Sequence, residues 1–93
     1  MMNIKEFKEL AEELSVSMFV GANEKEMIRQ RYNLNEMNVE ELVELRNQVV
    51  LAWATIMEAG YEIVNPLSDK YYNCMSKMTA ILDMEIHNKQ DAD

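Results

Sequence analysis

Glycine, proline and cysteine are all scarce in this chain. Its 93 residues include two glycines, one proline and one cysteine. So few glycines and prolines disfavour a fold made of many short strands and tight turns. Because Cys74 is the only cysteine, an internal disulfide and a zinc site built from several cysteines are both excluded. We therefore expect an all-α protein in a reducing compartment, the cytoplasm.

Basic residues are also few in comparison with acidic ones. Nine Lys and Arg side chains against 17 Asp and Glu side chains give a formal net charge of −8. This charge repels the phosphates of nucleic acids and the headgroups of anionic lipids. We therefore expect no direct binding to nucleic acid, whereas a basic protein surface would be attracted. The charge could equally serve only to keep a small protein soluble.

Long hydrophobic runs are missing as well. The longest unbroken apolar run covers residues 49–54, which is far shorter than a membrane-spanning helix. Near the start of the chain, Lys5 and Glu6 stand where a secretory signal peptide needs an apolar core. We therefore expect neither a membrane span nor a signal peptide.

Helix-start signals divide the sequence into about four helices. Asn3, Asn23 and Asn38 each precede a Glu by three residues, which is the spacing of a capping box. Asn65 followed by Pro66 suits a fourth helix start, because proline is favoured at the first helical position. With the apolar periodicity, these signals predict helices over residues 4–20, 24–32, 39–60 or 39–64, and 66–88.

These helices are expected to form one domain over residues 1–93, a small helical bundle. The last two predicted helices are long and almost directly connected. We therefore expect them to form an antiparallel hairpin, against which the first two helices pack. Residues 89–93 are polar and are expected to be a disordered tail.

The predicted helix over residues 39–64 carries more apolar surface than one neighbouring helix can cover. Its apolar positions spread over roughly 220° of the helix circumference, about twice the usual stripe. Such a helix needs cover from two sides. The second cover can come from the chain's own helices or from another molecule. Arg46 falls inside this arc and needs a carboxylate or an aromatic face, either within the chain or across an interface.

The last turn of the first predicted helix carries a second group of apolar side chains that depart from its apolar stripe. Val16, Phe19 and Val20 project onto the side that bears charges earlier in the helix, so they meet the second helix or stay exposed. Together with the wide arc, they give a predicted partner-binding surface. Its residues are Arg46, Val50, Trp53, Met57, Val16, Phe19 and Val20.

Residue patterns typical of catalysis, cofactor binding or metal binding are weak. Met75, Met78 and Met84 could offer thioethers to Cu(I), but the first two lie on the predicted core stripe. Asp83 and His87 lie one helical turn apart, which supplies only two metal ligands near a helix end. The clustered carboxylates lie on predicted solvated faces rather than in a cleft. We therefore expect no enzyme activity, no cofactor and no metal.

Two functional hypotheses remain. The first is a small, acidic, non-catalytic protein that regulates or inhibits a protein partner, basic partners included, and that self-associates into a homo-oligomer. Its size is compatible with the small regulators of phages and mobile elements. The alternative is an acidic nucleic-acid mimic that blocks the basic cleft of a DNA- or RNA-binding protein such as a host defence nuclease. Salt should weaken the mimic steeply and apolar docking little. The mimic's carboxylates would be Glu40, Glu44, Glu58, Glu62, Glu6, Glu9 and Glu13.

Overall fold

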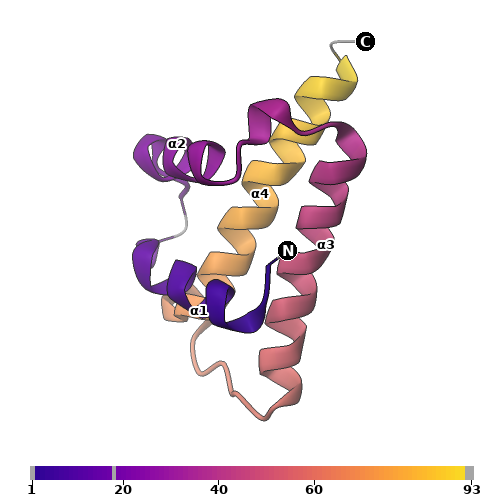
Figure 1. Ribbon diagram of the computed structural model, residues 1–93. Helices are drawn as coiled ribbons and strands as arrows, with labels where there is room; N and C mark the ends of the chain where they lie inside the picture. The colour runs from indigo at the N-terminus through magenta and orange to yellow at the C-terminus, as the bar shows by residue number, and fades with distance from the viewer. Residues whose placement is uncertain (1, 18, 92–93) are drawn as a thin grey trace.

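The structure is a computed structural model that describes residues 2–17 and 19–91. Within these residues it contains helices and no strands, so the predicted all-α fold is confirmed (Figure 1). The elements in chain order are α1 (Ile4–Glu13), α2 (Ala22–Arg31), the short 3₁₀ helix η1 (Leu34–Glu36), α3 (Val39–Glu58), the 3₁₀ helix η2 (Pro66–Ser68) and α4 (Lys70–Asp91).

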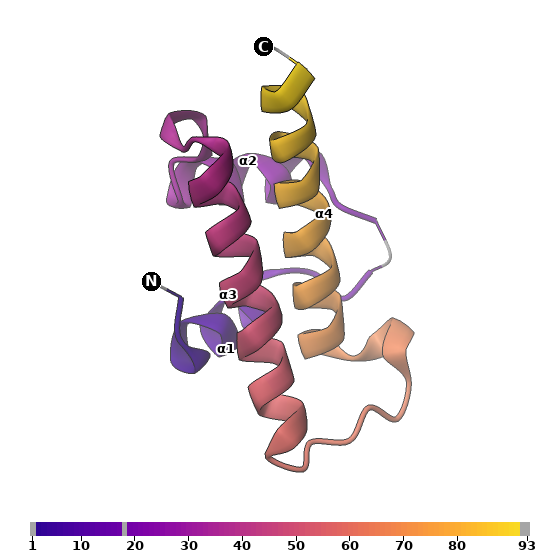
Figure 2. The same ribbon diagram turned by 90° about the vertical axis from the view of Figure 1, so that its right-hand side faces the viewer.

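The helices form two layers. The long helices α3 and α4 lie side by side and run in opposite directions, since Arg46 pairs with Asp83 and, further along α3, Trp53 contacts Tyr72 (Figures 1 and 2). Figure 2 shows α1 and α2 behind this pair of helices. Helices α1 and α2 therefore cover only one of the two broad faces of the α3–α4 hairpin.

The core fills the space between the two layers. Fully buried side chains come from α1, α3 and α4, and Ile28 and Leu34 extend the core to α2 and η1. Cys74 is among these residues, and burial raises the pKa of its thiol to about 12. The thiol therefore stays protonated at neutral pH and is a poor nucleophile.

Two of the predicted helix starts have the expected capping bonds. Asn3 accepts a hydrogen bond from the backbone N–H of Glu6 at 2.8 Å, and Asn38 accepts one from Glu41 at 2.8 Å. The Glu41 carboxylate in turn accepts from the N–H of Asn38 at 3.1 Å, so this capping box is complete. The predicted start at Asn23 is wrong. Helix α2 begins at Ala22 after Gly21, whose N–H donates to the carboxylate of Glu24 at 3.2 Å.

Helix α1 ends at Glu13, well before the predicted end at residue 20. Beyond it, the N–H of Ser15 donates to Glu24 at 2.7 Å, and the carbonyl of Ser15 accepts from Lys77 at 2.6 Å. These bonds to other elements take the place of helical backbone bonds. As a result, Val16, Phe19 and Val20 lie in the linker between α1 and α2 instead of on a helix.

The connection between α3 and α4 is longer than predicted. It covers residues 59–69, with Gly60 at a φ of +98° just after α3 and η2 in its second half. Pro66 therefore starts η2 rather than α4. The cap of α4 is Asp69, which accepts from the N–H of Tyr72 at 2.9 Å and from the hydroxyl of Tyr61.

The end of the chain also differs from the expectation of a disordered tail over residues 89–93. Helix α4 continues to Asp91, and residues 92–93 lie outside the described part of the chain. The ammonium group of Lys89 donates to the backbone carbonyls of η1 and its flank, namely Leu34, Asn35 and Met37. These bonds fasten η1 to the last turns of α4.

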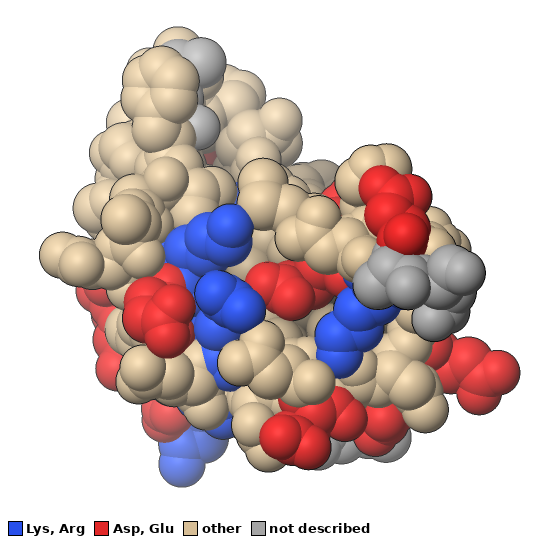
Figure 3. Space-filling model, turned by 90° about the horizontal axis from the view of Figure 1, so that it is seen from above, with Lys and Arg blue, Asp and Glu red and all other residues tan. Residues whose placement is uncertain are grey.

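Polar contacts fasten α2 to α4. Lys77 is only 3% exposed and forms an ion pair with Glu24 at 2.9 Å. Further along α2, the Nε atom of Arg29 lies 3.0 Å from the buried carboxylate of Glu85. Figure 3 shows the molecule from above the view of Figure 1, at the end where α2 and the last turns of α4 lie. Basic and acidic side chains alternate on this surface. The position of α2 therefore depends strongly on paired charges.

Replacing the Glu24 carboxylate should destabilise the fold strongly. Burial opposes the charged form of Glu24, but hydrogen bonds from Lys77, Ser15 and Gly21 outweigh it and lower its pKa from 4.5 to about 2. A lowered pKa of this size corresponds to about 3 kcal/mol of stability that is present above the unfolded-state pKa and lost as the pH falls towards 2.

Glu24→Gln should therefore lower the free energy of unfolding by about 3 kcal/mol or more at neutral pH, since it leaves Lys77 buried without its counter-charge. The measurement is urea unfolding at about pH 7 and about pH 3. The difference in free energy of unfolding between Glu24→Gln and the parent protein should be smaller at the lower pH. Glu26→Gln, on the exposed side of α2, is the matched control and should have little effect. Equal losses for the two variants would contradict this assignment.

Candidate interaction surface

One half of the wide apolar arc of α3 is buried in the core, and the other half is not. The buried half faces α1 and α4, and comprises Leu42, Leu45, Val49, Ala52 and Ile56. The other half continues onto α4 across the face of the hairpin that α1 and α2 leave uncovered (Figure 2). We call this surface the outer face. Helical spacing assigns to it Val43, Arg46, Val50, Trp53 and Met57 from α3, and Tyr72, Met75, Thr79 and Asp83 from α4.

Contacts between α3 and α4 organise the outer face. Arg46 pairs with Asp83 through Nε and Oδ1 at 2.6 Å. The partner that Arg46 requires is therefore supplied by the chain itself. The rings of Trp53 and Tyr72 meet edge to face, with centroids 6.4 Å apart. The indole N–H of Trp53 is buried and has no hydrogen-bond partner among residues 2–17 and 19–91.

The outer face has no net charge. Its only ionised side chains are Arg46 and Asp83, which neutralise each other. The acidic excess of a chain with a net charge of −8 therefore lies elsewhere. A surface that combines apolar, aromatic and methionine side chains with a single arginine has the composition of an interface core.

Two depressions lie at the loop end of the hairpin, and Tyr72 of the outer face lines one of them. One is lined by residues that include Ser17, Leu67 and Tyr72, and the other by residues that include Val16 and Val64. Leu67 and Val64 are 58% and 94% exposed, although both are apolar. The linker between α1 and α2 and the connection between α3 and α4 thus meet beside Tyr72.

The structure brings together some of the predicted partner-binding residues. Arg46, Val50, Trp53 and Met57 share the outer face. The three predicted residues in the linker lie in different environments. Val16 lines the same depression as Val64, Phe19 is 81% exposed, and Val20 packs against the core. Sequence reasoning missed the contribution of α4, which is carried by Tyr72, Met75, Thr79 and Asp83. Their spacing of three and four residues indicates that they share one face of α4, and this spacing could have been read from the sequence.

The carboxylates of the predicted nucleic-acid mimic are dispersed. Glu13 forms an ion pair with Arg31, and Glu62 lies in the connection after α3 ends at Glu58. Glu9 is exposed on α1. Glu58 is exposed at the end of α3, whereas Glu6, Glu40 and Glu44 border a groove between α1 and α3. No continuous row of carboxylates follows α3, since Glu62 is not part of the helix.

No family model, curated protein or solved structure matches this chain. Over the described residues, none of the helices combines the length and apolar character needed to cross a bilayer. The same part of the chain holds no group of three or more His, Cys, Asp or Glu side chains arranged to bind a metal ion.

Trp53 should contribute less to folding than a fully buried aromatic residue, because it lies at the edge of the core. Trp53→Ala should lower the free energy of unfolding by about 1–2 kcal/mol. The matched comparison is Phe7→Ala, at a position that is 0% exposed, and it should cost about 3–5 kcal/mol. Urea unfolding of both variants measures the difference. A loss for Trp53→Ala as large as that for Phe7→Ala would show that Trp53 is a core residue and not part of a free surface.

Proposed function

We propose that this chain is a non-catalytic interaction protein that binds a protein partner through the outer face and thereby regulates or inhibits that partner. The observation that carries the proposal is the outer face itself. It is largely apolar, has no net charge, and is not covered by α1 or α2, so its mostly half-buried side chains keep part of their surface exposed. Exposed apolar patches bordered by polar residues are typical of protein interaction sites.

The residue types on this face support the proposal. Interface hot spots are enriched in Trp, Tyr and Arg, and these occur together as Trp53, Tyr72 and Arg46. The unpartnered N–H of Trp53 is a donor that a partner's carbonyl could satisfy after a small side-chain movement. The ion pair of Arg46 is partly exposed and adds little to folding, so its two groups can take new partners at low cost.

Affinity capture from the native host, with matched variants, tests the proposal. Val50→Lys places a charge on the outer face, whereas Leu51→Lys places the same charge on the neighbouring position, which is 66% exposed and outside that face. Lysine stems tolerate partial burial, so both variants should fold, which thermal melts check. We expect a specific partner to be retained by the parent and Leu51→Lys and lost by Val50→Lys. Retention by all three proteins would contradict the proposal.

We also propose that the outer face allows self-association, because a second copy can dock there without opposing the net negative charges of the two chains. Sedimentation over a range of micromolar concentrations should show a dimer for the parent protein and a monomer for Val50→Lys. A parent protein that stays monomeric throughout this range would contradict self-association. In that case the outer face would bind only a different protein.

A further inference from the structure

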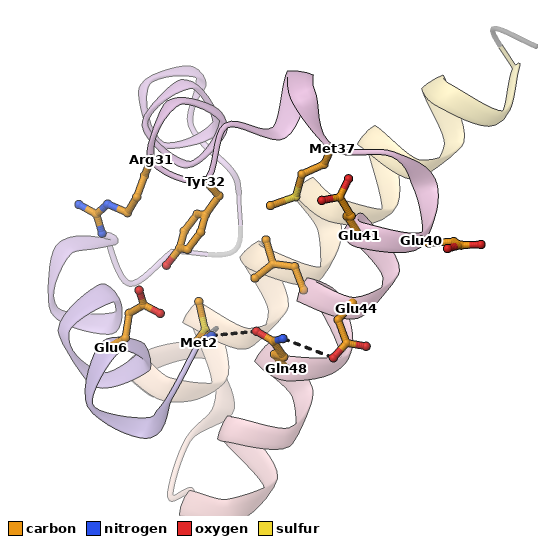
Figure 4. A pocket seen from close by; sticks show the side chains of 10 residues that line it. Met2, Glu6, Arg31, Tyr32, Met37, Glu40, Glu41, Glu44 and Gln48 are labelled. Atoms are coloured by element: carbon orange, nitrogen blue, oxygen red, sulfur yellow. Dashed lines mark hydrogen bonds between the residues drawn. The ribbon is translucent and has the colours of Figure 1, made fainter.

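Another hollow lies on a different side of α3, away from the outer face. It is a groove of about 640 Å³ between α1, the segment around η1 and the first half of α3 (Figure 4). We call it the acidic groove. It is lined by Met2, Glu6, Arg31, Tyr32, Met37, Glu40, Glu41, Glu44, Leu45 and Gln48.

The walls of the acidic groove include apolar groups from distant parts of the chain. Met2 and Leu45 belong to the core, and Met37 packs against it. The N–H of Met2 donates to the side chain of Gln48 at 2.8 Å, which holds the start of the chain against α3. Methionine side chains adapt to differently shaped apolar partners. The groove therefore offers an adaptable apolar lining.

Uncompensated carboxylates border this lining. Glu6, Glu40, Glu41 and Glu44 form no ion pair among residues 2–17 and 19–91. The one basic residue of the groove, Arg31, is paired with Glu13. Four further basic side chains are likewise paired with carboxylates outside the groove, namely Lys70, Lys77, Arg29 and Arg46. The potential of the groove is therefore negative.

Tyr32 adds an aromatic wall. In Figure 4 its ring extends from the end of α2 into the groove, towards Met2 and Glu6. Its hydroxyl oxygen is buried and has no hydrogen-bond partner in the described part of the chain. Burial, together with the nearby Glu6, raises the pKa of Tyr32 to about 12, so the hydroxyl stays protonated. An aromatic ring beside carboxylates favours a cationic side chain, which can contact both.

We propose that the acidic groove binds a basic amphipathic segment of a protein partner. Its Lys or Arg side chains meet Glu6, Glu40 and Glu44, and its apolar side chains contact Met2, Met37 and the ring of Tyr32. This charge complementarity selects a basic segment over an acidic or neutral one. The combination of an apolar lining and a charged rim matches an amphipathic helix docked in a groove.

The acidic groove and the outer face can be occupied at the same time. Glu44 and Gln48 of the groove are each two positions before Arg46 and Val50 of the outer face. Two residues correspond to about 200° around a helix, so the two pairs project to opposite sides of α3. The chain therefore has the geometry of an adaptor with two separate surfaces. Charge changes in the groove leave the outer face intact.

A fluorescent peptide that forms an amphipathic helix of leucine and arginine serves as the probe, with binding followed by fluorescence anisotropy. The test variant is the double substitution Glu40→Gln/Glu44→Gln. The matched control is Glu58→Gln/Glu62→Gln, which removes the same charge at the last residue of α3 and in the connection that follows it. All these positions are exposed, and thermal melts check that both variants fold. The expected result is an affinity about tenfold weaker for the test variant and within about twofold for the control.

Three results would overturn the proposal. Equal weakening of both double variants would show that the peptide responds only to net charge. Equally tight binding of the matching leucine and glutamate peptide would show that charge complementarity plays no part. Absence of binding at micromolar concentrations of the parent protein would show that the groove takes no basic segment. Val50→Lys should bind the probe like the parent, which separates this test from that of the outer face.

Discussion

A buried ammonium group connects the two layers of the molecule. Lys77 of α4 donates to Glu24 at the start of α2 and to the backbone carbonyl and hydroxyl of Ser15 in the linker. A charge buried to this degree is tolerated only while its partners stay in place. The end of α1, the path of the linker and the start of α2 are therefore fixed together, on the side of α4 where Lys77 projects.

This constraint explains why the outer face is open. Because Lys77 holds the linker and α2 on the same side as α1, neither helix is available to cover the other side of the hairpin. The buried half of the α3 arc is satisfied by α1 and α4, while Val50, Trp53 and Met57 are only partly covered. The core and the proposed partner-binding surface thus use different halves of one helix. A third side of α3, which carries Glu44, borders the acidic groove.

Some features that depend on neighbouring residues could be predicted from the sequence, although the local signals at Asn23 and Asn65-Pro66 misplaced the starts of α2 and α4. Features that depend on distant residues could not be predicted. The capping box at Asn38 involves residues three apart, and it was predicted correctly. The early end of α1 was missed because it depends on a lysine 62 residues away from Ser15. Local spacing paired Asp83 with His87, whereas Asp83 binds Arg46 across the hairpin and His87 pairs with Asp91.

The candidate surfaces follow the same rule. The width of the α3 arc depends only on the spacing of residues within one helix. The sequence therefore indicated Arg46, Val50, Trp53 and Met57 together. The contribution of α4 depends on how the two helices are aligned, which periodicity alone does not specify. The carboxylates Glu40 and Glu44 were predicted among those of a nucleic-acid mimic. Their role as the rim of a groove depends on Met2 and Tyr32, which reach α3 only in the folded chain.

Photo-crosslinking in the native host tests the central claim that the outer face is where a protein partner binds. A photoreactive phenylalanine analogue is incorporated at Val43, on the outer face, or at Leu51, outside it. Leu51 is the more exposed of the two, at 66% against 39%, so random collisions would favour it. The account predicts a discrete crosslinked product from position 43 and none from position 51. A product from position 51 alone, or equal products from both positions, would contradict it.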